Sequence, residues 1–297
     1  MQLSNKNIFS LYFFSYLLVS FFLLVGYAES EAKLRVADLK PDNQTVFSRL
    51  ELEAKSAVVY DMSQDKILYS KNPLDSLPLA SLAKLMTALV ASERAANNDR
   101  VIMITKEALN EEGDSGLKSG QSWTLKSLSN LALIASSNDA AAAIAQSFDD
   151  APFVSSMNDE AGRLGLSQTA FSNPTGLDID ENTGGARSSA YDITKLMAYI
   201  LKNKPGVVEA TRSPETTLHS IDNFDYNAKN TNPNVSSLSG VLASKTGFTD
   251  LAGGNLTVAF EIGPLRPVIL TVLGSSIQGR FDDTLKLITA VKHYYDY

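Results

Sequence analysis

Hydrophobic residues recur every three or four positions in six stretches of the chain, a pattern that predicts helices with one buried face. The first of these helices covers about residues 78–90, with apolar positions at Leu82, Leu85, Met86, Leu89 and Val90. The same spacing predicts the others at residues 125–135, 139–148, 152–164, 189–202 and 280–297. In the last helix this spacing predicts five residues that face the interior: Phe281, Leu285, Ile288, Val291 and Tyr295.

Segments rich in β-branched residues and bounded by turn residues predict strands. Residues 56–62 and 66–70 form an early hairpin, residues 100–105 a short extended piece, and residues 240–249, 255–262 and 268–274 three consecutive antiparallel strands. Helices separate the early strands from the late ones. We therefore expect an α/β fold: an antiparallel sheet flanked by helices, plus a mostly helical subdomain at about residues 90–205, with the site in the cleft between them.

The first 28 residues have the pattern of an export signal. Lys6 precedes an apolar run at residues 8–25, and small residues follow at positions 26–28 (GYA). The run approaches the roughly 20 residues that span a bilayer, so the segment is either cleaved or retained as a membrane anchor. We expect residues 29–53 to be a linker, residues 54–297 to be the folded domain, and the protein to be periplasmic or at the cell surface.

Composition excludes several kinds of site. The chain carries 26 Lys and Arg against 33 Asp and Glu, a net charge of −7, without a basic run that would favour nucleic acid. Cysteine is absent, and His219 and His293 are too few to hold zinc, so we expect no metal and no cofactor. Unless His219 serves as a base, a serine nucleophile needs a base other than histidine.

Three short motifs occur in order along the chain: S-x-x-K at Ser81 and Lys84, S-x-N at Ser136 and Asn138, and K-T-G beginning at Lys245. Each motif alone is weak. An isolated S-x-x-K is usually a helix start with a solvated lysine, S-x-N is usually a helix cap, and K-T-G is usually a surface strand with a bulge. Similar triplets or quartets stand at residues 63–66, 118–120 and 156–158, but only the first set combines order, spacing and supporting elements.

The wider sequence makes this set specific. The relevant segments are residues 80–87 (ASLAKLMT), 137–141 (SNDAA), 157–165 (MNDEAGRLG), 173–178 (NPTGLD), 230–232 (NTN) and 244–249 (SKTGFT). From about residue 56 to the C-terminus the chain resembles the low-molecular-mass penicillin-binding proteins that act as D-alanyl-D-alanine carboxypeptidases. This resemblance implies a β-lactamase/transpeptidase-like fold and makes residues 54–297 a D,D-peptidase catalytic domain.

The resemblance also implies substrates and inhibitors. Such enzymes trim the terminal D-alanine from peptidoglycan stem peptides ending in D-Ala-D-Ala through an acyl-enzyme, and β-lactams trap that intermediate covalently. The chain resembles the short members, some of which are D,D-endopeptidases, and we expect it to lack the C-terminal β-rich domain and amphipathic anchor of larger members. Ala186 and Arg187 stand where many members have a histidine or an aromatic pair, so the role of Arg187 stays open.

The residue types fit acyl transfer. A serine hydroxyl becomes nucleophilic when a base takes its proton, and a lysine can be that base when burial and a second cation lower its pKa. We predict Ser81 as the nucleophile and Lys84 as its base, with Lys245 as the second cation. Ser136 would relay a proton to the leaving D-alanine nitrogen, and Asn138 would orient Lys84 and bind the substrate backbone.

The strand that carries Lys245 supplies the predicted binding residues. Gly247 has no side chain, so an extended peptide can approach the strand edge closely. Thr246 or Thr249 would bind the terminal carboxylate of the substrate, and the family resemblance favours Thr246. The backbone N–H groups of Ser81 and Phe248 would form the oxyanion hole.

Three other functions stay open: a D,D-endopeptidase that cleaves peptidoglycan crosslinks, a class A-like β-lactamase, and a non-catalytic wall-binding module. A class A β-lactamase needs a glutamate on a loop after S-x-N. Glu160 falls in a predicted helix, and Glu181 and Glu215 lack the expected neighbouring residues. The wall-binding module is disfavoured because every reacting residue is present.

Overall fold

The computed structural model describes residues 46–95, 100–113, 116–148 and 152–296. The predicted signal or anchor and residues 29–45 of the predicted linker lie outside these ranges. Within them, no helix combines the length and the apolar character that crossing a bilayer requires.

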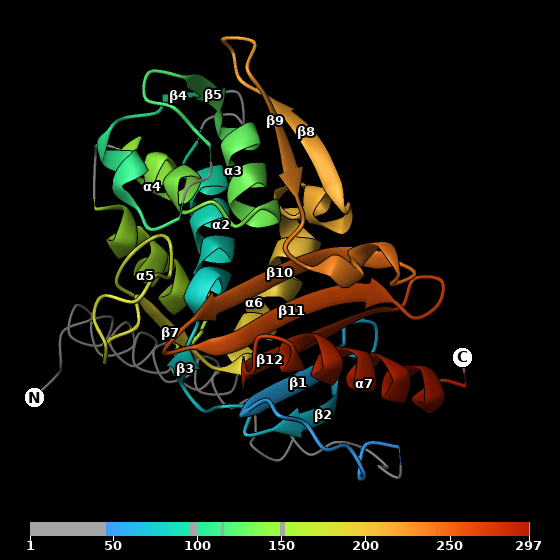
Figure 1. Cartoon of the computed structure of the whole chain (residues 1–297). Helices are drawn as coiled ribbons and strands as arrows, with labels where there is room; N and C mark the ends of the chain where they lie inside the picture. Colours follow the sequence, from blue (N-terminus) through green and yellow to red (C-terminus); the bar gives the residue numbers. More distant parts are fainter. Residues whose placement is uncertain (1–45, 96–99, 114–115, 149–151, 297) are drawn as a thin grey trace, which may run out of the picture. The chain divides into compact units, whose positions relative to one another are not determined.

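A five-stranded antiparallel sheet organises the described residues (Figure 1). In spatial order its strands are β10 (Val241–Thr249), β11 (Gly253–Glu261), β12 (Pro267–Ser275), β1 (Ser56–Asp61) and β2 (Lys66–Lys71). The early hairpin and the three late strands are therefore confirmed. Pairing of β1 with β12, which sets Val58 opposite Thr271, joins the two ends of the domain in one sheet.

The predicted helices are also present, each within a few residues of its expected limits. They are α2 (Lys84–Arg94), α3 (Leu125–Ile134), α4 (Asn138–Gln146), α5 (Phe153–Arg163), α6 (Ala190–Asn203) and α7 (Gly279–Tyr294). Short 3-10 turns add η2 (Ala80–Ala83), η3 (Glu107–Asn110), η4 (Pro205–Val207), η5 (Glu209–Arg212) and η6 (Pro233–Ser236). Figure 1 shows α2 to α5 grouped together and α7 lying along the sheet, so the predicted α/β class is confirmed.

The sheet separates two hydrophobic cores, because successive side chains of a strand point to opposite faces. On β1, Val58 belongs to the core that contains α2, α3, α4 and α6, whereas Ala57 and Val59 belong to the core beneath α7. The same alternation on β10 directs Ala243 into the first core. Lys245, two residues further along, therefore points toward the helical side of the sheet.

Of the short strands outside the main sheet, the sequence predicts β4 (Val101–Met103) alone, as the extended piece at residues 100–105. The short strands are β3 (Leu77–Pro78), β6 (Ala170–Phe171) and β7 (Ala186–Ser188) in one sheet, β4 with β5 (Ser122–Thr124), and β8 (Glu215–His219) with β9 (Asp225–Lys229). In the β8–β9 hairpin only Leu218 and Ala228 are buried. One apolar residue per strand is too little to produce an alternating pattern.

Two expectations need correction at the edges of the fold. In α7, Leu285 is 38% exposed, because the buried face is centred on Thr284, Leu287 and Val291. The packed chain also begins before the predicted boundary at residue 54. Phe47 and Leu52, assigned to the linker, are buried in the core beneath α7.

Asp283 of α7 fastens this first segment to the domain. Its fully buried carboxylate accepts hydrogen bonds from the Glu53 N–H (3.1 Å), the Ala54 N–H (2.8 Å) and the Ser275 hydroxyl (2.9 Å). Buried donors that lose their acceptor cost about 1–3 kcal/mol each. The carboxylate therefore links the segment before β1, the last strand and the last helix.

We expect Asp283→Ala to lower the free energy of unfolding by about 3 kcal/mol, since it leaves three donors without their acceptor. Urea denaturation followed by circular dichroism measures the change. Asp282→Ala, at an exposed position of the same helix, is the matched control and should change stability by less than about 0.5 kcal/mol. Equal stability of the two variants would contradict the role of Asp283.

Candidate active site

Ser81 and Lys84 lie at the junction of η2 and α2. The helix predicted over this stretch begins as a 3-10 turn, in which residues three apart eclipse each other. Ser81 is half-buried, whereas Lys84 is completely buried. The preceding residue, Ala80, has a left-handed backbone (φ +50°), which fixes the direction in which the chain enters the turn.

The Lys84 amine has three hydrogen-bond partners. Its Nζ lies 2.8 Å from Ser81 Oγ, 2.6 Å from Asn138 Oδ1 and 2.7 Å from the carbonyl oxygen of Thr175. An ammonium group has three protons to donate, one for each of these oxygens. A neutral amine has two protons, for Asn138 and Thr175, and a lone pair that accepts the Ser81 proton. The same three oxygens can therefore hydrogen-bond to Lys84 in either protonation state without movement of the side chain.

Burial lowers the pKa of Lys84 to about 7, because the charged form loses its hydration. The carboxylate of Glu111 acts in the opposite direction and raises this pKa. Both forms of Lys84 are therefore populated near neutral pH.

A tight loop presents the Thr175 carbonyl to Lys84. Asn173 holds the loop, since its Oδ1 accepts the Gly176 N–H (2.7 Å) and its Nδ2 donates to the Leu177 carbonyl (2.9 Å). Gly176 has φ +78°, and a Cβ there would lie 1.9 Å from the Ala80 carbonyl oxygen. Only glycine permits this approach of the loop to the residue before Ser81.

Ser136 stands in the break between α3 and α4 with a left-handed backbone (φ +60°). Ser137 caps α4 by accepting the Ala140 N–H (3.0 Å), so the cap falls on the middle residue of the motif. The Lys245 Nζ donates to Ser136 Oγ at 2.9 Å. The break between the helices thereby brings Ser136 of the S-x-N motif into contact with Lys245 of the K-T-G motif.

Lys245, which the sequence predicts to act mainly through its charge, lies in a buried environment. Its Nζ also donates to the Thr246 carbonyl (2.8 Å). Burial holds the pKa of Lys245 well below its ordinary value, and the charges of Lys84 and Arg280 lower it further. The surroundings of Lys245 therefore disfavour its charged form.

Both polar atoms of the Asn138 side-chain amide form hydrogen bonds within the protein. Its Oδ1 accepts from Lys84, as predicted, while its Nδ2 donates to the Glu112 carbonyl at 2.6 Å. The nitrogen that was expected to bind the substrate backbone therefore holds the loop that contains Glu111 and Glu112.

The predicted binding residues on β10 separate into different environments. Thr246 is buried, and its Oγ1 lies 2.5 Å from Thr231 Oγ1. Thr249 instead donates to Asp178 Oδ1 (3.0 Å) and accepts the Ala252 N–H (3.2 Å), so its hydroxyl serves the turn after β10. Phe248 is 43% exposed.

Gly247 is required by the close packing of β10 against η2. A Cβ at Gly247 would lie 2.8 Å from the Leu79 carbonyl oxygen and 3.3 Å from the Leu82 nitrogen. Gly247 therefore has a structural role in this packing, in addition to the predicted role of letting a substrate approach the strand. The strand carrying Lys245 reaches Ser81 because no side chain separates them.

Four residues of the site were missed from the sequence: Glu111, Thr175, Thr231 and Arg280. Arg280, at the start of α7, donates through Nη1 to the Gly247 carbonyl (2.7 Å). Thr175 contributes a backbone atom to Lys84, and the effect of Glu111 depends on a loop whose path no local pattern indicates. The N-T-N segment was noticed only as part of the family resemblance.

The alternative residues weighed from the sequence lie elsewhere. Ser63 donates to Asp61 (2.6 Å) in the β1–β2 turn, and Ser156 Oγ accepts from Arg94 (2.8 Å). His219 is exposed and lies 2.7 Å from Asp225. Glu160 is held by Arg163 on α5, with Nε of the arginine 2.6 Å from Oε2.

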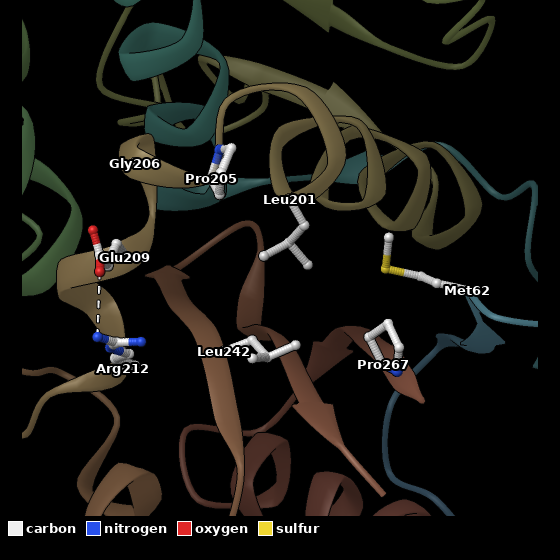
Figure 2. Close-up of a pocket in the computed structure, with 8 residues that line it drawn as sticks. All are labelled: Met62, Leu201, Pro205, Gly206, Glu209, Arg212, Leu242 and Pro267. Atoms are coloured by element: carbon white, nitrogen blue, oxygen red, sulfur yellow. Dashed lines mark hydrogen bonds and ion pairs between the residues drawn. The ribbon is translucent and has the colours of Figure 1, made fainter. Parts of the chain in front are cut away.

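The described residues contain no group of three or more His, Cys, Asp or Glu side chains arranged to hold a metal ion. A hollow of about 370 Å³ lies beside α6 and the sheet. Its lining is mainly apolar and includes Met62, Leu201, Leu242 and Pro267 (Figure 2). An ion pair between Glu209 and Arg212 (3.2 Å) stands at one side. None of the predicted site residues lines this hollow.

Comparison with known proteins agrees with the motifs. Residues 43–276 match the model of the Peptidase_S11 family, described as D-alanyl-D-alanine carboxypeptidase. DacF of Bacillus subtilis, a D-alanyl-D-alanine carboxypeptidase, is 35% identical over 237 residues, which make up 77% of this chain and 59% of DacF. The chain thus spans less than two thirds of that relative.

Two further proteins extend the comparison. A D-alanyl-D-alanine endopeptidase of Pseudomonas aeruginosa is 32% identical over 232 residues, 75% of this chain and 73% of the relative. The cefotaxime-bound crystal structure of penicillin-binding protein D2 from Listeria monocytogenes is 31% identical, with a TM-score of 0.71 over 81% of this chain and 98% of that one. The predicted transpeptidase-like fold is thereby confirmed.

Glu111→Gln should lower the pKa of Lys84 below its value of about 7. The carboxylate favours the ammonium form, so its removal disfavours that form and the amine becomes neutral at lower pH. An NMR titration of the Lys84 side chain measures the change. Glu112→Gln, at the exposed neighbouring position, should leave the titration unchanged, and an equal response of the two variants would contradict the assignment.

Proposed function

The chain belongs to the D-alanyl-D-alanine carboxypeptidase family of serine peptidases, and we propose that it removes the terminal D-alanine from peptidoglycan stem peptides. Ser81 is the proposed nucleophile and Lys84 its general base. The observation that carries this proposal is the 2.8 Å contact between a fully buried lysine amine and a half-buried serine hydroxyl.

The first half of the proposed reaction forms an acyl-enzyme. The neutral Lys84 amine takes the Ser81 proton while Oγ attacks the carbonyl carbon of the penultimate D-alanine. When the tetrahedral intermediate collapses, the peptide C–N bond breaks and the departing nitrogen needs one proton. Ser136, whose Oγ lies 2.9 Å from the Lys245 amine, supplies this proton and recovers one from the Lys84 ammonium, so that Lys84 is neutral again in the acyl-enzyme.

The second half returns the enzyme to its starting state. Water attacks the ester carbon, Lys84 accepts a proton from the water, and Ser81 regains its hydroxyl as the shortened peptide leaves. The terminal carboxylate of the substrate binds at Thr246, beside Lys245. A carboxylate at this place favours the ammonium form of Lys245 and so opposes the effect of burial on its pKa.

A D,D-endopeptidase is the second candidate. The supporting observation is the Pseudomonas aeruginosa relative, an endopeptidase of which this chain covers 73%, against 59% of the carboxypeptidase DacF. The bond chemistry is the same in both reactions. They differ in whether the leaving amine belongs to a free D-alanine or to a second stem peptide.

A class A-like β-lactamase is less well supported. Such an enzyme needs a glutamate that activates water for deacylation. Glu160 is paired with Arg163, and Glu181 and Glu215 are exposed. We therefore propose that β-lactams act as inhibitors that remain on Ser81.

Export is the remaining part of the proposal. Peptidoglycan lies outside the cytoplasmic membrane, and Lys6 followed by the apolar residues 8–25 gives the N-terminus the composition of a signal or anchor. We propose that the enzyme works in the periplasm or at the cell surface.

We expect incubation with benzylpenicillin to add the mass of one inhibitor to the protein, with the adduct on Ser81. Intact-mass spectrometry and peptide mapping provide the measurement. Ser81→Ala should form no adduct, whereas Ser63→Ala, in the other S-x-x-K sequence, should react like the wild type. A wild-type protein that stays unmodified, or that hydrolyses penicillin completely and fast, would overturn the proposal.

Mass spectrometry of purified muropeptides distinguishes the two peptidase activities. The carboxypeptidase should convert pentapeptides to tetrapeptides with release of free alanine, and leave crosslinked dimers intact. Splitting of dimers into monomers without loss of terminal alanine would instead establish the endopeptidase. Ser81→Ala should lower either activity by at least about 10³-fold, since the nucleophile is lost.

A further inference from the structure

Thr231 occupies a fixed place between the helical subdomain and β10. Its backbone N–H donates to the carbonyl of Ile134, the last residue of α3 (3.1 Å). Its hydroxyl lies 2.5 Å from that of Thr246. Thr231 is thus joined on one side to the end of α3, two residues before Ser136, and on the other to the strand of Lys245.

Amide side chains hold the backbone on both sides of Thr231. Asn230 Nδ2 donates to the carbonyls of Thr211 (2.8 Å) and Ser213 (3.0 Å). Asn232 Nδ2 donates to Ser244 Oγ (2.8 Å), and its Oδ1 accepts the Asn234 N–H (3.0 Å). The Thr231 hydroxyl is therefore held in position before any ligand arrives.

The direction of the bond between the two hydroxyls determines what Thr246 can do. Each hydroxyl has one proton. If Thr246 donates to Thr231, it has no proton left for a substrate carboxylate. If Thr231 donates to Thr246, the Thr246 proton is free, and a hydroxyl that accepts a hydrogen bond becomes a better donor.

We propose that Thr231 is a positioning residue for the terminal carboxylate of the substrate, because its hydroxyl donates to Thr246 and so turns the Thr246 proton toward that carboxylate. The proposal rests on the proposed function, in which Thr246 binds the carboxylate. Thr231 itself acts through Thr246 and does not touch the substrate. Binding of the carboxylate selects this direction of the hydrogen bond.

The test compares Thr231→Val and Thr231→Ser with the wild type on a peptide that ends in D-Ala-D-Ala. Valine keeps the shape of threonine but has no proton to donate, so KM should rise about tenfold while kcat changes less than twofold. Serine keeps the hydroxyl and should restore KM to within about threefold. Thr217→Val, at an exposed position of β8, is the matched control and should behave like the wild type.

A second substrate separates positioning from general damage to the fold. On the same peptide with a C-terminal carboxamide, Thr231→Val and the wild type should have equal kcat/KM, since the carboxylate is missing. An equal loss on both substrates would overturn the proposal. So would an unchanged KM on the carboxylate peptide.

A double-mutant cycle with Thr246→Val tests whether Thr231 acts through Thr246. The double variant should be no worse than Thr246→Val alone, because the second hydroxyl has nothing left to orient. Multiplied losses would show an independent contact and overturn the proposal. A wild type that neither reacts with penicillin nor cleaves the peptide would overturn the proposed function too, whereas an active wild type with an unaffected Thr231→Val overturns the Thr231 assignment alone.

Discussion

The rest of the site depends on one buried amine. Lys84 has no contact with water, yet three oxygens surround its Nζ at 2.6–2.8 Å. Without these oxygens, burial of the amine would be costly in either protonation state. With them, loss of hydration brings the pKa to about 7 while the hydrogen bonds keep the side chain in place. The balance between desolvation and hydrogen bonding makes the lysine a usable base at neutral pH.

That balance requires distant parts of the chain to meet. The oxygens come from η2, from the start of α4 and from the loop after β6, and β10 closes the fourth side. Two glycines permit the approach: Gly176 lies against the Ala80 carbonyl, and Gly247 lies against Leu79. Both contacts position the backbone on either side of Ser81. The close backbone packing and the chemistry at Lys84 therefore depend on each other.

The motifs made it possible to select the side chains proposed to react, whereas the surroundings of these side chains could not be predicted. Ser81, Lys84, Ser136, Asn138 and Lys245 could be selected because three weak motifs occur in one order on suitable elements. The lowered pKa of Lys245 was unpredictable, since it depends on burial by residues far away in the sequence. The contribution of the Thr175 carbonyl could not be predicted, because every residue has a backbone carbonyl and the residue type does not indicate which one contacts Lys84. The main sheet was predictable from β-branched segments bounded by turn residues, whereas the β8–β9 hairpin, with one buried residue in each strand, carried no such signal.

The sheet between the two cores also has a mechanical consequence. The segment that enters the domain at residues 46–54 is fixed by Asp283 and by the core beneath α7, while Lys84 and its partners belong to the opposite core. A pull on the chain at this entry point loads α7 and the outer face of the sheet first. The five strands stand between that load and the amine. A force applied at this entry point would therefore reach the hydrogen bonds around Lys84 only after transmission through the sheet.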